Sequence, residues 1–166
     1  MNKTYFLFFR MTNNNFDLKK EVLEIALQRT QERIDMIESA LETAQDSSND
    51  DTKSSAGDKY ETSREMIQQD INRYQKQLLE ANKDLQQLIS IESTMEDISE
   101  FVRLGSFVET NTGLYLIATS IGALKIGVIS IFVISPASPI GQLLIGKKVG
   151  DSFTFNKINQ KVITVH

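Results

Sequence analysis

The sequence predicts an α+β protein in which an N-terminal antiparallel α-helical coiled-coil hairpin is followed by a small β-rich domain. Two long helical patterns occupy residues 16–45 and 61–98, and apolar residues recur at heptad spacing in the second. Toward the C-terminus Val, Ile, Phe and Gly become frequent and charged residues become rare. We therefore assign residues 1–11 to an extension or disordered N-terminus, residues 12–100 to the coiled coil and residues 101–166 to the β-rich domain.

The charge distribution supports this division and excludes several kinds of activity. Residues 12–100 carry 10 Lys/Arg and 20 Asp/Glu, whereas residues 101–166 carry 6 Lys/Arg and 2 Asp/Glu. A hairpin this acidic is not a general nucleic-acid-binding module, because phosphates would repel it. The chain has no cysteine and a single histidine, His166, at its last position. A thiol nucleophile is thereby excluded and a Ser-His-Asp triad disfavoured, and the lack of cysteine fits a reducing, cytoplasmic location.

The first eleven residues resemble a secretory signal only superficially. Their apolar run, Tyr5–Phe9, is five residues long, whereas a signal peptide needs an apolar region of about 7–15 residues. No small-residue cleavage site follows the run. We interpret Met11 as the translational start and residues 1–10 as an upstream extension, with a start at Met1 as the alternative.

The two helical segments are suited to pair with each other. The first, residues 16–45, contains no Gly or Pro, and about 30 residues at about 1.5 Å each would form a rod of about 45 Å. The second presents a narrow heptad seam, which requires one helical partner rather than a globular core. Its seam residues are Ile67, Ile71, Tyr74, Leu78, Ala81, Leu85 and Leu88. The first segment is the obvious partner, and the antiparallel hairpin then has an acidic tip near residues 46–61.

The tip carries two carboxylates for which two roles stay open. Asp58 and Glu61 lie three residues apart, directly after Gly57, at the expected start of the second helix. The same spacing is that of a capping box, in which Asp58 caps the helix and Glu61 reaches back to the cap. The spacing alone favours capping. Residues three apart on a helix also face the same way, however, so the two carboxylates could act on one target.

The C-terminal region is predicted to contain short strands and one short helix. Turn signals at residues 111–113 and 150–151 separate runs rich in β-branched and aromatic residues. The expected strands are residues 101–109, 114–120, 128–134, 152–155 and 161–165. Residues 139–145 are expected to form the helix.

Two further patterns are superficial. Leu114–Ile134 is a mostly apolar run of 21 residues, but Lys125 lies at its centre, where a charge is costly in lipid. We interpret the run as two strands joined by a Gly-containing turn and expect no membrane association. Gly141–Lys148 nearly matches a phosphate-binding loop, yet Lys148 replaces the hydroxyl that would hold magnesium, and a strand pattern follows where the motif needs a helix. We reject it as a nucleotide site.

Three stretches together resemble one family, the bacterial Gre transcript-cleavage factors, which act on RNA polymerase. The tip, Gly57–Glu65, is similar to that family's Gly-Asp-x-x-Glu-x-x-x-Glu. Val102–Val108 is similar to the entry into its C-terminal domain. Ser135–Asp151 is similar to its Ser-Pro-[Leu/Ile]-x-x-x-Leu-[Leu/Ile]-Gly-Lys-x-x-Gly-Asp signature. The resemblance covers roughly residues 16–166.

The resemblance implies an FKBP-like C-terminal domain and a mechanism in trans. The domain would dock at the rim of the polymerase's secondary channel, and the coiled coil would enter the channel. Asp58 and Glu61 would be partial ligands of a Mg²⁺ ion shared with the polymerase, whose own active site cuts the backtracked RNA. The chain would then be a monomer and not itself an enzyme, would bind no cofactor stably alone and would reach the nascent RNA 3′ end only indirectly. Candidate polymerase-binding residues are Ser138, Pro139, Gly146 and Lys147.

Two other functions remain open. Cleavage factors of this family often carry a basic patch on the coiled coil, whereas residues 12–100 are strongly acidic here. The chain could therefore occupy the secondary channel as a transcription regulator without cleavage activity. It could also be a coiled-coil adaptor or chaperone-like interaction module, in which Asp58 and Glu61 only cap a helix.

Overall fold

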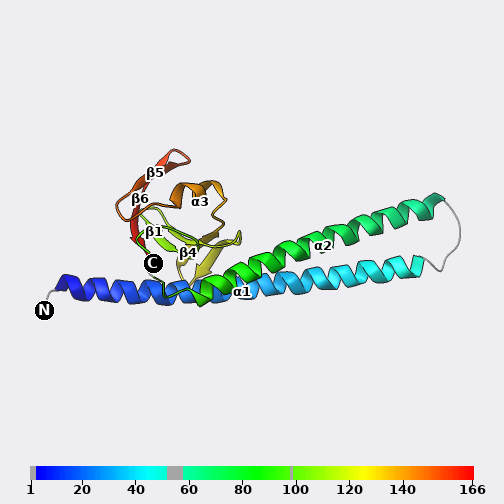
Figure 1. The fold of residues 1–166 in the computed structure, drawn as a ribbon, viewed down its shortest axis with the longest axis horizontal. Helices are drawn as coiled ribbons and strands as arrows, with labels where there is room; N and C mark the ends of the chain where they lie inside the picture. The colour runs from blue at the N-terminus through cyan, green and yellow to red at the C-terminus, as the bar shows by residue number, and fades with distance from the viewer. Residues whose placement is uncertain (1–2, 52–57, 98) are drawn as a thin grey trace. The chain divides into compact units, whose positions relative to one another are not determined.

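The computed structural model describes the backbone of residues 3–51, 58–97 and 99–166, and side chains from residue 15 onward except for residues 49–61 and 98. These residues form two compact units (Figure 1). One unit combines Met1–Leu27 with Gln87–His166, and the other comprises Gln28–Gln86.

Two long helices precede a six-stranded sheet, so the predicted α+β class is confirmed. Helix α1 spans Lys3–Asp51 and helix α2 spans Asp58–Ser93. The two run antiparallel, since Lys19 of α1 bonds to the main chain of Met95, while Arg33 further along α1 pairs with Asp84 of α2.

Both helices differ in length from the sequence prediction. Helix α1 continues beyond residue 45 to Asp51, and within this extension Ser47 Oγ donates to the Thr43 carbonyl at 2.9 Å. Helix α2 ends at Ser93 rather than at residue 98. There the Thr94 amide bonds to the Ile91 carbonyl three residues back (3.2 Å), which tightens the last turn and ends the helix.

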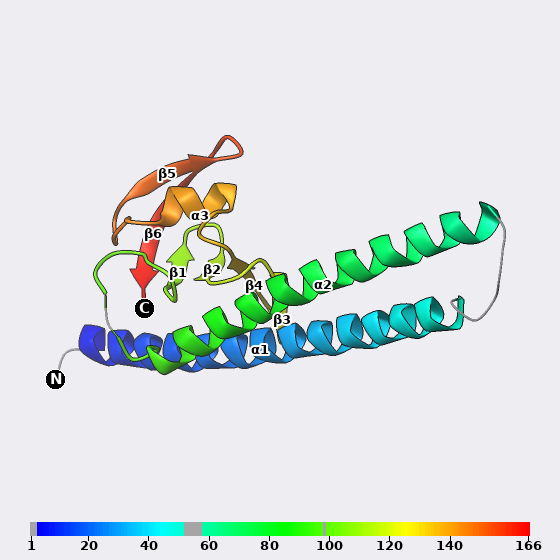
Figure 2. The same cartoon turned by 45° about the vertical axis from the view of Figure 1, so that its right-hand side comes forward.

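The unit of residues 28–86 is a two-helix coiled coil with the predicted seam. Ile71 and Ala81 of α2 are buried, as is Ile34 of α1, whereas Ile67 and Leu78 are only partly buried. Arg33 Nη1 lies 3.1 Å from Asp84 Oδ2, across the two helices. In Figure 2, α1 and α2 run alongside each other in this unit and move apart toward the end of α1 and the start of α2.

The sheet combines antiparallel and parallel pairing in the order β3-β4-β2-β1-β6-β5. Strands β2 and β4 are parallel and every other neighbouring pair is antiparallel. The strands are β1 (Phe107–Thr110), β2 (Leu114–Ile117), β3 (Gly122–Ile126), β4 (Ile129–Ile134), β5 (Ser152–Phe155) and β6 (Ile158–Val165). Helix α3 (Pro139–Leu144) lies between β4 and β5 and confirms the short helix predicted there.

The prediction of two strands in Leu114–Ile134 is wrong, because this segment forms three strands. Gly122 and Gly127 both adopt positive φ, +91° and +57°, which only glycine adopts without strain. Ile126 pairs with Ile129, so Gly127 and Val128 form a two-residue hairpin turn between β3 and β4. Among the residues that the structure describes, no helix has the length and apolar content to cross a membrane.

The predicted strand at residues 101–109 is also shorter in the structure. Strand β1 begins at Phe107, and only an isolated bridge joins Phe101 to Lys148 further upstream. Between them Gly105 turns with φ +84°, and Ser106 Oγ accepts a hydrogen bond from the Arg103 amide at 3.0 Å. These turns interrupt the strand that the composition of residues 101–109 suggests.

The sheet is covered on both faces. One face packs against α3 and β5 in a core that includes Val108, Ile117 and Leu144. The other face packs against the base of the two long helices, and the residues of this second core are Leu18, Val22, Leu23, Ala26, Leu88, Ile91, Phe107, Leu116, Ala118, Leu124, Ile131 and Val133. The base of the helices and the sheet therefore share one hydrophobic core. The domain boundaries proposed from the sequence stay a prediction.

Because the core is shared, shortening a buried side chain of α1 should lower the stability of the sheet. Leu23 is 1% exposed and belongs to this core, so Leu23→Ala should lower the free energy of unfolding by about 2–5 kcal/mol. The matched control is Leu79→Ala, since Leu79 is 57% exposed, and this change should cost less than about 0.5 kcal/mol. Urea denaturation, with hydrogen exchange of the β2 amides as a probe of the sheet, measures both. Unchanged protection of β2 in Leu23→Ala would contradict the shared core.

Candidate functional site

The two candidate carboxylates lie at the beginning of α2. The helix starts at Asp58, and the backbone of Glu61 lies one turn further along. Residues three apart in a helix lie on one side of it. The side chains of Asp58 and Glu61 lie outside the described residues, so both the capping role and the metal-binding role stay predictions.

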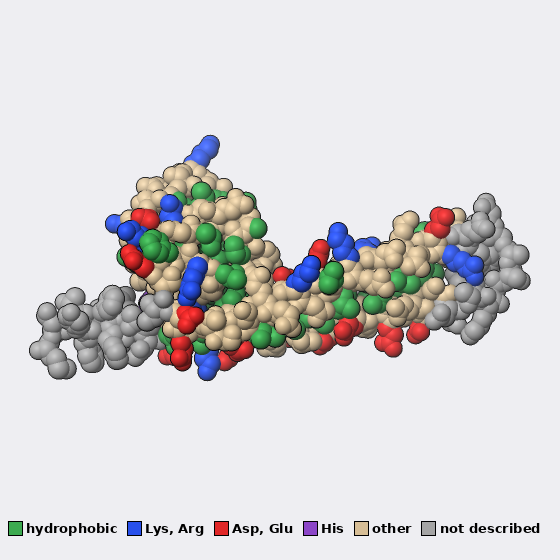
Figure 3. All heavy atoms as spheres, viewed as in Figure 1, with side chains coloured by type: hydrophobic (Ala, Val, Ile, Leu, Met, Phe, Trp, Pro, Cys, Tyr) green, Lys and Arg blue, Asp and Glu red, His purple; other side chains and the backbone are tan. Residues whose placement is uncertain are grey.

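The coiled coil is acidic overall, but its positive charges are gathered on α2. Arg73, Lys76 and Lys83 recur at spacings of three and seven residues, which places them on one face of the helix. Figure 3 shows most of the Lys and Arg side chains of the coiled-coil unit along α2, together with some Asp and Glu, and Asp and Glu side chains along α1. Arg73 pairs with Asp70 at 2.9 Å and its guanidinium carbon lies 5.0 Å from the centre of the Tyr74 ring. Glu80 lies on the same face, four residues after Lys76 and three before Lys83, so these basic residues alternate with acidic ones.

The residues suggested for partner binding around α3 have clear structural roles. Ser138 caps α3: its Oγ accepts from the Gly141 amide at 3.1 Å and donates to the Ser135 carbonyl at 2.7 Å. Pro139 occupies the first turn, where its missing N–H costs nothing. A Cβ at Gly141 would collide with the main-chain oxygen of Ser135, so only glycine fits there. Whether these residues also contact a partner stays a prediction.

The end of the same segment is also fixed by the backbone. Gly146 adopts φ +77° directly after α3, and its amide donates to the Val102 carbonyl at 2.8 Å. The Lys147 carbonyl accepts from the Val102 amide at 2.7 Å, whereas the Lys147 side chain is half-buried. Asp151 Oδ2 accepts from the Lys148 amide at 3.0 Å. The resemblance to a phosphate-binding loop thus reflects the backbone needs of a helix end and a turn.

An apolar and basic surface adjoins this segment. Phe101 is 49% exposed and Val149 is 59% exposed, and both lie beside the bridge between Phe101 and Lys148. We call Phe101, Ile145, Lys147, Lys148 and Val149 the Phe101 patch. Lys148 Nζ is 4.0 Å from Glu100 Oε1, too far for a strong ion pair in water, which leaves the patch net positive.

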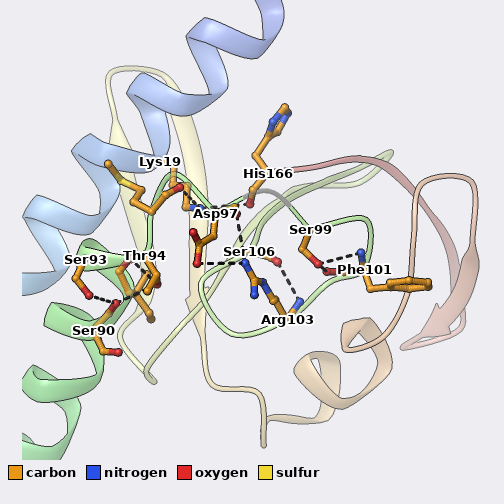
Figure 4. A network of polar contacts seen from close by, with 12 residues as sticks. Lys19, Ser90, Ser93, Thr94, Asp97, Ser99, Phe101, Arg103, Ser106 and His166 are labelled. Atoms are coloured by element: carbon orange, nitrogen blue, oxygen red, sulfur yellow. Dashed lines mark hydrogen bonds and ion pairs between the residues drawn. The ribbon is translucent and has the colours of Figure 1, made fainter.

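A small cavity of about 100 Å³ lies in the unit that contains the sheet. Figure 4 shows the polar residues around it, which come from α1, the segment after α2 and the end of β6. Lys19 is 3% exposed, and its ammonium donates to the Met95 and His166 carbonyls, each at 3.4 Å. Arg103 lies on the opposite side and reaches Asp97 Oδ2 at 3.9 Å.

Burial changes the acid–base properties of two of these groups. Desolvation, and secondly the charge of Arg103, lowers the pKa of Lys19 below its usual value. Desolvation and then the charge of Lys19 likewise lower the pKa of His166. Asn15 Nδ2 lies 3.2 Å from His166 Nε2, and protonation of Nε2 would remove an acceptor for this amide.

The sequence analysis did not single out Lys19, although a signal for it exists. Lys19 shares one helical face with Val22, Leu23 and Ala26, three, four and seven residues later, all of which are buried. A lysine in the middle of an apolar face is a candidate for burial. The Phe101 patch has no comparable signal, because its members meet only through the tertiary fold. Among the described residues, no group of three or more His, Cys, Asp or Glu side chains could hold a metal ion.

Residues 127–166 match the family model described as "Transcription elongation factor, GreA/GreB, C-term". The match covers β4, α3, β5 and β6 and includes the whole Ser135–Asp151 signature. The match confirms the resemblance to the Gre family over residues 127–166.

Comparison with solved structures gives five similar chains, and two of them are the following. One, described as "Structure of the transcription factor Gfh1", is 23% identical, with 85% of this chain and 93% of that chain covered and a TM-score of 0.32. The other, Gfh1 of Thermus aquaticus, is 24% identical, with 89% and 93% covered and a TM-score of 0.32. A search of curated proteins finds no significant match.

The lowered pKa of His166 predicts a pH-dependent stability. Between the folded-state pKa and the usual value of 6.5, the unfolded chain binds more protons than the folded chain, so stability falls as the pH decreases through this window. His166→Gln should lose this component and show a flatter melting temperature between about pH 7.5 and 5.5. The measurement is the difference in melting temperature between the wild type and His166→Gln at each pH. The carboxylates that titrate in both proteins contribute equally and cancel in this difference. Parallel curves would contradict the assignment.

Proposed function

Because its C-terminal segment matches the GreA/GreB domain, we propose that this chain is a transcription elongation factor that binds RNA polymerase. In this proposal the coiled coil inserts into the secondary channel and stimulates cleavage of backtracked RNA. The family match over residues 127–166 is the observation that carries the proposal. The chain would act on the polymerase's own active site and would not be an enzyme by itself.

The helical hairpin supports an action at a distance from the docking domain. Antiparallel helices α1 and α2 form a narrow rod whose far connection includes residues 52–57. A helix pair is thin enough to enter a channel that would exclude a globular domain, since a single helix with its side chains is about 10–12 Å wide.

The chemistry of the tip suits a ligand shared with another protein. Asp58 and Glu61 supply carboxylate oxygens, which Mg²⁺ prefers, but two carboxylates fall short of the six ligands of its octahedral shell. They would hold the ion only together with groups of the polymerase. A second Mg²⁺ in such a site supplies charge stabilisation in an in-line displacement. The role of Asp58 and Glu61 would be to hold and orient it.

The Phe101 patch is the docking face that we favour on the C-terminal domain. It combines exposed apolar side chains with Lys147 and Lys148, a composition suited to an acidic and partly apolar partner surface. Ser138, Pro139 and Gly146 shape the adjoining helix α3 and its ends. In this proposal they contribute chiefly by holding Lys147 and its neighbours in place.

A second function is favoured by one observation. The α1 side of the coiled coil is lined by acidic residues, among them Glu32, Asp35, Glu38 and Glu42. This surface would repel RNA, and on α2 the charges of Arg73, Lys76 and Lys83 are offset by the neighbouring Asp70, Glu80 and Asp84. A channel-binding regulator without cleavage activity is therefore the alternative. A coiled-coil adaptor is disfavoured by the family match.

Substitution of the tip carboxylates should separate cleavage from binding. Asp58→Asn combined with Glu61→Gln removes both negative charges but preserves size, so cleavage of a deliberately backtracked elongation complex should fall on the order of 100-fold or more. Polymerase binding should stay within about twofold, because the docking domain is unchanged. Glu65→Gln, which removes a carboxylate one turn further along α2, is the matched control and should cleave normally.

The outcomes distinguish the two functions. Wild-type cleavage that is lost only in the double variant supports the cleavage factor. Binding of the wild-type chain without shortened RNA at any Mg²⁺ concentration would establish the regulator instead. Absence of polymerase binding would overturn both.

The docking face can be tested independently of the tip. Phe101→Ser combined with Val149→Ser should weaken polymerase binding about tenfold or more, because buried aromatic contacts dominate such interfaces and about 1.4 kcal/mol corresponds to a factor of ten. Val128→Ser is the control, since Val128 is 99% exposed in the β3–β4 turn and lies outside the patch. Equal affinities for the wild type and the double variant would exclude the Phe101 patch as the docking face.

A further inference from the structure

Lys19 is a charged residue buried where an apolar one would be expected. It is 3% exposed, between buried Leu18 and Val22 in a helix whose face packs on the sheet. Lysine is almost never fully buried unless its ammonium is paired. The sequence and the fold therefore require a reason for a lysine at this position.

The partners of Lys19 come from two segments that are far apart in the sequence. Its Nζ donates at 3.4 Å to the Met95 carbonyl, in the turn after α2, and at 3.4 Å to the His166 carbonyl, after β6. The two acceptors are 76 and 147 residues from Lys19. Figure 4 shows Lys19 pointing from α1 toward His166 and the segment that carries Asp97. The side chain of Lys19 thus connects α1 to the segment after α2 and to the end of β6 by hydrogen bonds, which form only when these three segments are close together.

The apolar contacts beside Lys19 are poorly suited to that task. The helix base offers Leu18, Val22, Leu23 and Ala26 to a sheet face made of Leu, Ile, Val, Ala and Phe side chains. Aliphatic surfaces of this kind stabilise a contact without fixing one geometry, because many arrangements bury nearly the same area. Directional hydrogen bonds are satisfied in one arrangement only.

A second polar contact connects α2 to the sheet. Gln87 Nε2 donates to the Ala118 carbonyl at 3.0 Å, directly after β2. Lys19 and Gln87 therefore attach the two helices to two different parts of the sheet domain. Together with the apolar contact between the helices and the sheet, two separated polar contacts restrict the orientation more than one does.

We propose that Lys19 is a positioning residue, which selects one orientation of the helix base on the sheet rather than stabilising the fold. Its hydrogen bonds are long, and burial disfavours its charge, as the lowered pKa of Lys19 also indicates. Replacing a buried charge by an apolar residue of similar volume is often neutral or stabilising. The adjoining cavity of about 100 Å³ is lined by Lys19 and His166 and leaves room for water beside them.

The test measures orientation and stability separately. The chain contains no cysteine, so spin labels can be placed at Glu24→Cys on α1 and Asn159→Cys on β6, both exposed positions in the unit that contains the sheet. In this background Lys19→Met should retain the wild-type melting temperature or raise it. The label-to-label distance distribution, measured by pulsed electron paramagnetic resonance, should broaden about twofold or acquire a second maximum. Lys20→Met, at the exposed neighbouring lysine, should change neither quantity.

Each outcome decides the proposal. A single narrow distribution with the wild-type mean in Lys19→Met overturns it. A melting temperature lowered with an unchanged distribution assigns Lys19 a purely stabilising role and also overturns it. If Lys19→Met does not fold, Lys19→Gln, which keeps a donor on a shorter side chain, should fold and give an intermediate width; a wild-type distribution there would contradict the proposal.

A functional readout deepens the proposal and rests on the proposed polymerase-binding function. Lys19→Met should bind polymerase with wild-type affinity through the Phe101 patch, yet stimulate RNA cleavage several-fold less, because fewer molecules present the helices in the competent orientation. Loss of binding in the wild-type chain would refute the proposed function and leave the distance measurement valid. Normal cleavage by Lys19→Met together with a broadened distribution would show that orientation does not limit cleavage, and would overturn this functional extension alone.

Discussion

The packing of the helix base on one face of the sheet is the interaction on which the rest of the structure depends. Leu18, Val22, Leu23 and Ala26 are nearly inaccessible to solvent only because Phe107, Leu116 and Leu124 lie against them. Burial of several large aliphatic side chains contributes about 1.5–3 kcal/mol each. The helices could not bury these residues by pairing with each other alone, since a two-helix seam is narrow. The sheet, for its part, would expose an entire apolar face without them. Neither part is complete by itself.

The sequence predicted what depends on local periodicity and missed what depends on tertiary contacts. The heptad seam of α2 and the short helix α3 follow from residue spacing, and the structure confirms both. The third strand within residues 114–134 was missed because a continuous apolar run does not reveal a hairpin turn at Gly127 and Val128. Likewise, Lys19 and the Phe101 patch become visible only when distant segments come together. The family signature in Ser135–Asp151 could be recognised because caps, positive-φ glycines and turn carboxylates impose fixed spacing on the sequence.

The candidate tip shows how one pattern can have two physical meanings. A carboxylate at the start of a helix is favourable because of the helix dipole and the free N–H groups there. A pair of carboxylates that must meet a metal ion on another protein also benefits from a rigid helix end. The start of α2 at Asp58 suits both roles. Residue types and spacing therefore cannot separate structure from function at this position, and the separation has to come from the partner's chemistry.

In the unit that contains the sheet, segments that are far apart in the sequence contact each other. Lys19 meets His166 across 147 residues, and β1 pairs with β6. During synthesis the helices leave the ribosome first, while the strands that cover their base are still missing. The apolar base of the helices stays exposed until these strands have been made. The strands then pack on the helices through contacts between residues far apart in the sequence, and such contacts form slowly. The apolar base of the helices thus precedes the strands that cover it, so general chaperones that shield apolar helices have an opportunity to act before the sheet is made.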